Sequence, residues 1–184
     1  MKKLIFLLTI LCSIFILNGC GTSGTTSSET DAMIGEWCAL NGKGFAKIKI
    51  AKENNEYIYD GKTYQVIIQK ESSSPKSPLI IKIANGNSSI LDKNKASLTK
   101  TNDKHTLYID GRESQVLKYN PKTNTISLLV GGDVHREFKP TKNITEQEKR
   151  EWADKAVKEL SNTYKAKRDG EYGIIDKIDL SLIK

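Results

Sequence analysis

The residue types that most often carry catalysis are few in this chain, and their spacing matches no familiar reaction centre. The two histidines, His105 and His135, stand apart from each other and from the cysteines, so neither fits the ligand spacing of a zinc site. The sequence holds no Gly-x-Ser-x-Gly, His-Glu-x-x-His or phosphate-loop motif. Asp176 and Asp179 pair two carboxylates, but solvation beside an alternating apolar segment accounts for them. We therefore predict a protein that is not an enzyme, with no catalytic residues, no metal site and no cofactor.

The most distinctive thiol, Cys20, follows an apolar leader. Lys2 and Lys3 precede residues 4–17, which carry no charge and are apolar except for Thr9 and Ser13. At about 1.5 Å per residue, the apolar run spans roughly 21 Å, which is less than the roughly 30 Å hydrocarbon core of a bilayer. The run therefore predicts a secretory signal rather than a membrane-spanning helix.

The segment Leu17-Asn18-Gly19-Cys20 resembles the lipobox of bacterial lipoproteins. The resemblance implies that residues 1–19 are removed and that Cys20 becomes the first residue, carrying acyl chains such as palmitate that hold the protein on a membrane. The domain would then lie in the cell envelope, on the outer side of the cytoplasmic membrane or on the outer membrane facing the periplasm. Gly21 follows the cysteine where Asp is associated with inner-membrane retention, so the family pattern favours the outer membrane in a two-membrane cell.

Removal of the leader leaves one unmodified cysteine and a moderately basic chain. Cys38 then has no disulfide partner, and we expect it to be a small buried side chain beside Trp37. The formal net charge is +7, or +5 without Lys2 and Lys3. The lysines are spread along the chain and not interleaved with aromatics in one basic stretch, which argues against nucleic acid as a partner. A solvated surface explains them, and contact with anionic lipid or cell-wall polymer is the alternative.

The remaining sequence predicts a tether followed by one mainly β domain. Residues 20–33 show no apolar periodicity and predict a flexible tether, and residues 34–184 form the domain. Within it, short alternating segments are separated by turn residues up to residue 139. Asp60-Gly61 and Asp110-Gly111 predict two-residue hairpins. Further reversals are predicted at residues 120–124 and 131–133, and a loop at residues 72–78. An antiparallel meander of eight or nine strands favours closure into a barrel, which removes the sheet edges.

A change of period after Pro140 predicts one helix over residues 145–168. Thr145 and Glu148 have the spacing of a capping box. The apolar residues of this segment fall on one face, which must pack on the sheet: Trp152, Ala153, Ala156, Val157, Leu160 and Tyr164. Alternating apolar residues from Ile174 to Leu182 predict a short final strand.

The opening strand carries Gly35-Glu36-Trp37, which resembles the Gly-x-Trp of lipocalins and related calycins. The resemblance covers the domain in architecture, because barrel, helix and short final strand follow in the same order. Its motif is three residues plus one arginine. It implies a lipocalin-like barrel in which Trp37 closes one end and Arg136 packs over it as structural residues. Simple alternation places Val134, Arg136 and Phe138 on one face of the last barrel strand, where a stack of Arg136 on Trp37 would satisfy the guanidinium.

Two functions follow from such a barrel. In the first, the protein acts in the envelope as an inhibitor, exclusion or assembly factor, by contact with another macromolecule that is itself an envelope protein or polymer. Lys47 and Lys49, on an outer face of the sheet, are then candidate contact residues. In the alternative, the barrel holds one small apolar ligand, as a lipocalin-like binder. The candidate lining residues of that pocket are Tyr57, Tyr59, Tyr64, Tyr108 and Tyr119.

Overall fold

The structure is a computed structural model that describes residues 29–70, 73, 79–165 and 174–175 of the 184-residue chain. Cys20, the leader and most of the tether predicted at residues 20–33 lie outside the described residues. So do most of the predicted loop at residues 72–78 and the part of the final strand after residue 175.

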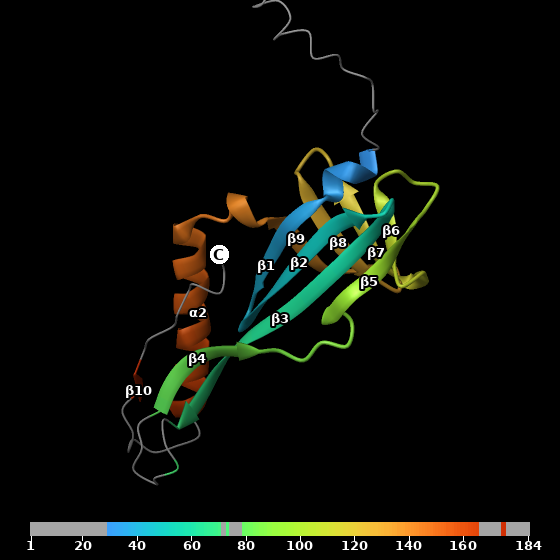
Figure 1. The fold of residues 1–184 in the computed structure, drawn as a ribbon. Coiled ribbons are helices and arrows are strands. Elements are labelled where there is room, and N and C mark those ends of the chain that lie inside the picture. Colours follow the sequence, from blue (N-terminus) through green and yellow to red (C-terminus); the bar gives the residue numbers. More distant parts are fainter. Residues whose placement is uncertain (1–28, 71–72, 74–78, 166–173, 176–184) are drawn as a thin grey trace, which may run out of the picture.

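The described chain is mainly β, as predicted, with one C-terminal helix (Figure 1). The strands are β1 (Gly35–Asn41), β2 (Gly44–Glu53), β3 (Glu56–Lys70), β4 (Leu79–Asn85), β5 (Lys93–Lys100), β6 (Thr106–Ile109), β7 (Arg112–Asn120), β8 (Thr125–Val130), β9 (Asp133–Pro140) and β10 (Ile174–Ile175). The helices are the 3₁₀ turns η1 (Glu29–Met33) and η2 (Thr141–Asn143) and the α-helix α2 (Glu146–Lys165).

Eight of the strands form a closed antiparallel barrel. The hydrogen-bonded order runs β3-β2-β1-β9-β8-β7-β6-β5, and a β3–β5 ladder closes the ring. β4 and β10 extend the sheet beyond the barrel, with β10 parallel to β4. The predicted closure of the meander is therefore confirmed.

The prediction of a hairpin at Asp60-Gly61 is wrong. Both residues lie inside β3, whose first half pairs with β5 and whose second half pairs with β4. A Cβ on Gly61 would overlap the Leu91 carbonyl oxygen and the Tyr59 ring, so the glycine allows a close approach. The turn between β2 and β3 instead uses Asn54 and Asn55, with φ of 49° and 68°.

The other predicted reversals are present. Asp110 and Gly111 have φ of 53° and 65° and join β6 to β7, as a type I′ turn requires. Gly131 and Gly132 join β8 to β9, and residues 121–124 join β7 to β8. At each of these turns the two flanking strands pair directly with each other, so the turn residues themselves determine where the chain reverses.

Helix α2 covers apolar residues on the outer surface of the sheet. Its capping box is formed as predicted, since the Thr145 backbone N–H donates to Glu148 (2.8 Å) and the Glu148 N–H donates to the Thr145 hydroxyl (3.1 Å). The helix stripe packs with outward-facing strand residues into one buried cluster: Cys38, Phe45, Val66, Ile81, Ile144, Trp152, Ala153 and Ala156. The barrel wall therefore buries apolar side chains on both of its faces.

Replacing Gly61 with alanine tests the close approach inside β3. We expect Gly61→Ala to lower the free energy of unfolding by at least about 2 kcal/mol, because the new methyl group meets a backbone oxygen that cannot move freely. Gly42→Ala is the control, since its Cβ meets no atom within 4 Å and it bears only the cost of a φ of +49°, about 1 kcal/mol. Urea unfolding measures both. Equal losses would contradict the close approach.

Candidate functional site

The barrel interior is filled by side chains. Tyr59, Leu107, Leu117 and Phe138 are fully buried, with 0% of their surface exposed, and they belong to one continuous core cluster. A cavity able to hold a ligand would leave its lining accessible to a water-sized sphere, and these side chains are not. Binding of an apolar molecule inside this barrel would need several core side chains to move.

The five tyrosines predicted to line a pocket do not surround one space. Tyr57 and Tyr59 lie in the core, and the Tyr59 hydroxyl donates to the Leu91 carbonyl oxygen at 3.1 Å. Burial raises the pKa of Tyr59 far above its usual value, so the hydroxyl keeps its proton. Tyr119 packs half-buried against the same core. Tyr64 belongs to the outer cluster, and Tyr108 is half-buried outside both clusters.

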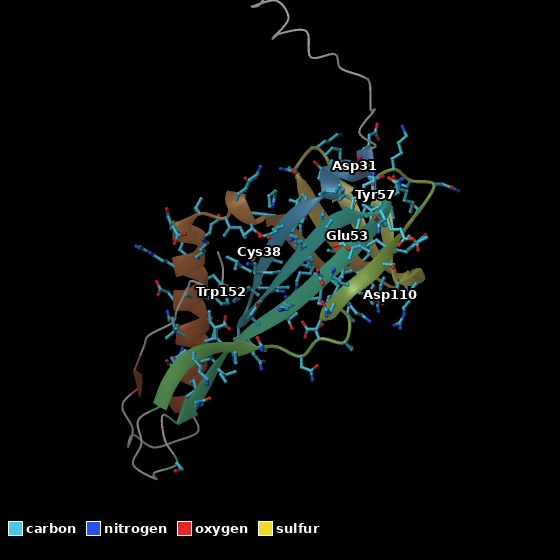
Figure 2. The ribbon with its side chains drawn as sticks, viewed as in Figure 1. Asp31, Cys38, Glu53, Tyr57, Asp110 and Trp152 are labelled. Atoms are coloured by element: carbon cyan, nitrogen blue, oxygen red, sulfur yellow. The ribbon has the colours of Figure 1, made fainter. Side chains whose placement is uncertain are left out.

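Trp37 lies at the end of the barrel that η1 covers. Its indole N–H donates to the Met33 carbonyl oxygen at 2.9 Å, and its ring meets Tyr119 edge-on at 6.1 Å. Asp31 of η1 also accepts a 2.5 Å hydrogen bond from the Tyr57 hydroxyl (Figure 2). Trp37 thus occupies the place expected for a residue that closes the barrel.

Arg136 lies away from Trp37, which differs from the predicted stack. Trp37 pairs with Pro140, whereas Arg136 lies four residues back along β9, about 13 Å at the usual strand rise. It pairs with Leu128, and its charge acts on Cys38 of β1. The tryptophan has its own hydrogen-bond partner, so it needs no cation above it.

A β-bulge also overturns the predicted alternation along β9. Leu128 pairs with Arg136 while Leu129 pairs with Val134, so His135 is an extra residue on β9. The bulge reverses the direction of the residues before it, and Val134 is 64% exposed while Phe138 is buried. The prediction that Val134 shares a face with Phe138 is wrong for this reason.

The ladder between β1 and β9 is the shortest seam of the barrel. It holds two residue pairs, Trp37 with Pro140 and Cys38 with Lys139. Within the described part of the chain, residues 39–41 of β1 and 133–137 of β9 have no ladder partner across this seam. The two strands therefore separate beyond Cys38.

A cleft of about 690 Å³ opens where these strands separate, and α2 forms its other wall. This volume is within the range of about 300–1,000 Å³ typical of ligand sites. Figure 2 shows Cys38 and Trp152 on the two sides of the space between β1 and α2. The lining comes from β1, the β1–β2 turn, β9, Ile144 and α2: Cys38, Ala39, Leu40, Asn41, Gly42, Val134, His135, Arg136, Glu137, Lys139, Ile144, Glu148, Glu151, Trp152 and Lys155.

Two buried donors in this cleft make no hydrogen bond. Both atoms, the Nε of Arg136 and the Nε1 of Trp152, are shielded from solvent and have no acceptor among the residues that the structure describes. Trp152 is only 7% exposed, and its ring is held edge-on against Phe45 at 5.4 Å. Burial lowers the pKa of Arg136, but a guanidinium remains charged at neutral pH. Most buried polar groups in proteins are satisfied. These two are exceptions, as are His105 Nδ1, Gln115 Oε1 and Thr141 Oγ1 elsewhere in the described residues.

Cys38 forms an inert part of the wall. Burial raises the pKa of its thiol to about 11, although Lys47, Lys149 and Arg136 act in the opposite direction. A thiol with that pKa is protonated at neutral pH and is a poor nucleophile. The prediction that Cys38 is a small buried side chain beside Trp37 agrees with its exposure of 1%.

The rim of the cleft is charged but balanced. Lys139 donates to Glu148 at 2.9 Å, and the Thr145 N–H and Lys139 together lower the pKa of that carboxyl. The remaining charged rim residues are Glu137, Glu151 and Lys155. Among the described residues that line the cleft, Arg136 is therefore a half-buried cation with no carboxylate partner.

The outer lysine face predicted as a contact surface is also neutralised in part. Lys49 lies in register between Glu36 of β1 and Asp60 of β3. Lys47 is half-buried beside Cys38 and opposite Lys62. This part of the sheet carries mixed charge rather than a positive patch.

Sequence reasoning named Arg136 as structural and Trp152 as core packing, and so missed the cleft that they share. One available signal was Trp152, because a tryptophan at the first turns of a helix brings an N–H donor that needs a partner when buried.

No family model matches the chain, and searches of the curated proteins and of the solved structures found no match either. Among the residues that the structure describes, no group of three or more possible ligands could hold a metal ion. No helix in that part is long and apolar enough to cross a membrane.

Alkylation of Cys38 tests the inert thiol. In the full chain carrying Cys12→Ala and Cys20→Ala, Cys38 is the one remaining thiol. With a pKa of about 11 its thiolate fraction at pH 8 is roughly 200-fold below that of a free cysteine. We expect iodoacetamide to modify it at least about 100-fold more slowly in buffer than in 8 M urea, as followed by mass spectrometry. Rapid labelling of the folded protein would show a nucleophilic thiol and contradict this assignment.

Proposed function

We propose that this protein is a non-enzymatic lipoprotein of the bacterial cell envelope that binds another macromolecule in the cleft between α2 and the β1–β9 seam. Acyl chains on Cys20 would hold it on a membrane, and residues 20–28 would serve as its tether. The predicted tether of residues 20–33 is too long at its end, because Glu29–Met33 form η1 and Met33 is buried in the barrel core. The partner would be an envelope protein or polymer, and the protein would act as an inhibitor, exclusion or assembly factor.

One observation carries the binding part of the proposal: two buried donors without acceptors line the same cleft. Leaving such a group unsatisfied costs about 1–3 kcal/mol. Because both atoms are shielded from a water-sized sphere, a partner that supplies acceptors recovers that free energy only once the two side chains turn toward the cleft. The filled barrel leaves no ligand space among its core side chains, which supports a site at the open seam between β1 and β9. The low reactivity of Cys38 supports binding rather than covalent chemistry.

The anchoring part rests on Leu17-Asn18-Gly19-Cys20 and the uncharged run before it. We expect Cys20→Ala to abolish incorporation of labelled palmitate and to leave the leader attached, because the sulfur that accepts the lipid is gone. Metabolic labelling and the mass of the purified chain measure both effects, with Cys12→Ala as the matched control. Lipid labelling that persists in Cys20→Ala would refute the anchor.

Photo-crosslinking in cells tests the location of the binding site. Val134 lines the cleft and is 64% exposed, so p-benzoylphenylalanine at this position should capture the partner. The same group at Lys49, on the outer sheet face, is the control. We expect a discrete adduct from position 134, none from position 49, and a yield at least about tenfold lower when Arg136→Gln is added.

Each outcome bears on the proposal. Adducts of equal yield from both positions, or none from position 134, would overturn the cleft as the binding site. An adduct insensitive to Arg136→Gln would overturn the role of the unpartnered donors. The thermal unfolding midpoint of each variant shows whether the fold is kept.

A further inference from the structure

We infer that the cleft takes an extended polypeptide segment bearing a carboxylate, which adds as a strand to the free edge of β1 and places its carboxylate at Arg136. This inference rests on the proposed function and specifies the chemistry of the partner at the same site. It combines two independent features, an open strand edge and an unpartnered guanidinium.

The backbone of β1 provides the first feature. On its β2 side, β1 is paired along its whole length from Gly35 to Asn41. On its β9 side, pairing stops at Cys38, so in the described structure residues 39–41 present an edge without a partner strand. Every second residue of such an edge directs its N–H and C=O outward, which is a template for an added strand. Ala39, Leu40 and Asn41 all line the cleft, so an added strand would lie inside it.

The bulge at His135 prevents the barrel from using this edge itself, because it turns the first half of β9 away from the direction needed to continue the ladder. The open edge is thus a consequence of the native register of β9, and α2 stands over it as a wall.

Arg136 provides the second feature and selects the charge of the segment. Its Nε is buried without an acceptor, in a chain where Lys52, Lys93, Lys95, Lys104, Lys139 and Lys149 each contact a carboxylate. A carboxylate matches the guanidinium fork in shape and charge and forms strong charge-assisted hydrogen bonds.

The rim distinguishes a carboxylate from a phosphate. Glu137, Glu148 and Glu151 all line the cleft, and Glu148 already engages Lys139. Lys139 and Lys155 offset two of these three carboxylates, so the rim has an excess of one negative charge before Arg136 is counted. A group with close to two negative charges is therefore opposed more strongly than a carboxylate with one. The site therefore favours a carboxylate on an otherwise neutral, strand-forming segment.

Synthetic peptides test the inference directly on the full chain in detergent. The probes are fluorescein-labelled hexapeptides of alternating valine and threonine with one glutamate placed at each position in turn, and a matched set with glutamine. We expect fluorescence polarisation to show one glutamate position binding at least about tenfold more tightly than its glutamine counterpart. Arg136→Gln should remove this difference, Arg136→Lys should keep part of it, and Lys49→Gln should leave it unchanged.

N-methylation of the best peptide tests strand addition separately from charge. Methyl groups on the alternate amides that face β1 should abolish binding, and methyl groups on the other alternate amides should not. Equal binding of the two methylated peptides, equal affinity for glutamate and glutamine, or the same preference in Arg136→Gln would each overturn the inference. Absence of binding by every peptide would also overturn it. If the adduct at position 134 persists in that case, the proposed function stands and only the ligand class fails.

Discussion

The packing of Phe45 against Trp152 is the contact on which the rest of the structure depends. Phe45 projects from the outer side of β2, stacks on Tyr64 at 4.5 Å and receives the edge of Trp152 at 5.4 Å. It is fully buried and belongs to the same outer cluster as Trp152, Ala153 and Ala156 of α2. The same contact orients the Trp152 ring and so leaves its N–H at the cleft without an acceptor. Helix position, barrel cover and cleft wall therefore share one cause.

The cleft follows from a conflict between two ways of closing the barrel. The ring requires β9 to meet β1, and Trp37 with Pro140 and Cys38 with Lys139 satisfy that requirement. The bulge at His135 bends the rest of β9 away, and Val134 turns outward as a result. Two ladder pairs suffice because the core behind them is continuous: the inward-facing buried residues of β1, β2, β8 and β9 belong to the same cluster. Interior packing, rather than hydrogen bonding across this seam, holds the barrel closed.

Much of the fold could be predicted because it depends on local patterns. Alternation located the strands, the Thr145–Glu148 spacing located the start of α2, and Asp110-Gly111 located a hairpin. Asp60-Gly61 is the same dipeptide with the opposite outcome, because the passage of Leu91 over Gly61 is a long-range event that no local pattern records. The site depends on the same kind of event. Arg136 and Trp152 become neighbours of one cleft only through the register of residue 37 with residue 140.

The free-energy cost of the two unsatisfied donors explains how a protein with a filled barrel can keep an open seam between β1 and β9. Each buried N–H without an acceptor destabilises the free protein by about 1–3 kcal/mol, which is a large fraction of a typical domain stability of about 5–15 kcal/mol. A core as complete as this one tolerates that cost, since Tyr59, Phe138, Leu107 and Leu117 are fully buried within it. A partner that satisfies Arg136 and Trp152 recovers the same free energy on binding once the two side chains turn toward the cleft. The stability that the filled interior supplies therefore offsets the cost of the two unsatisfied donors at the cleft.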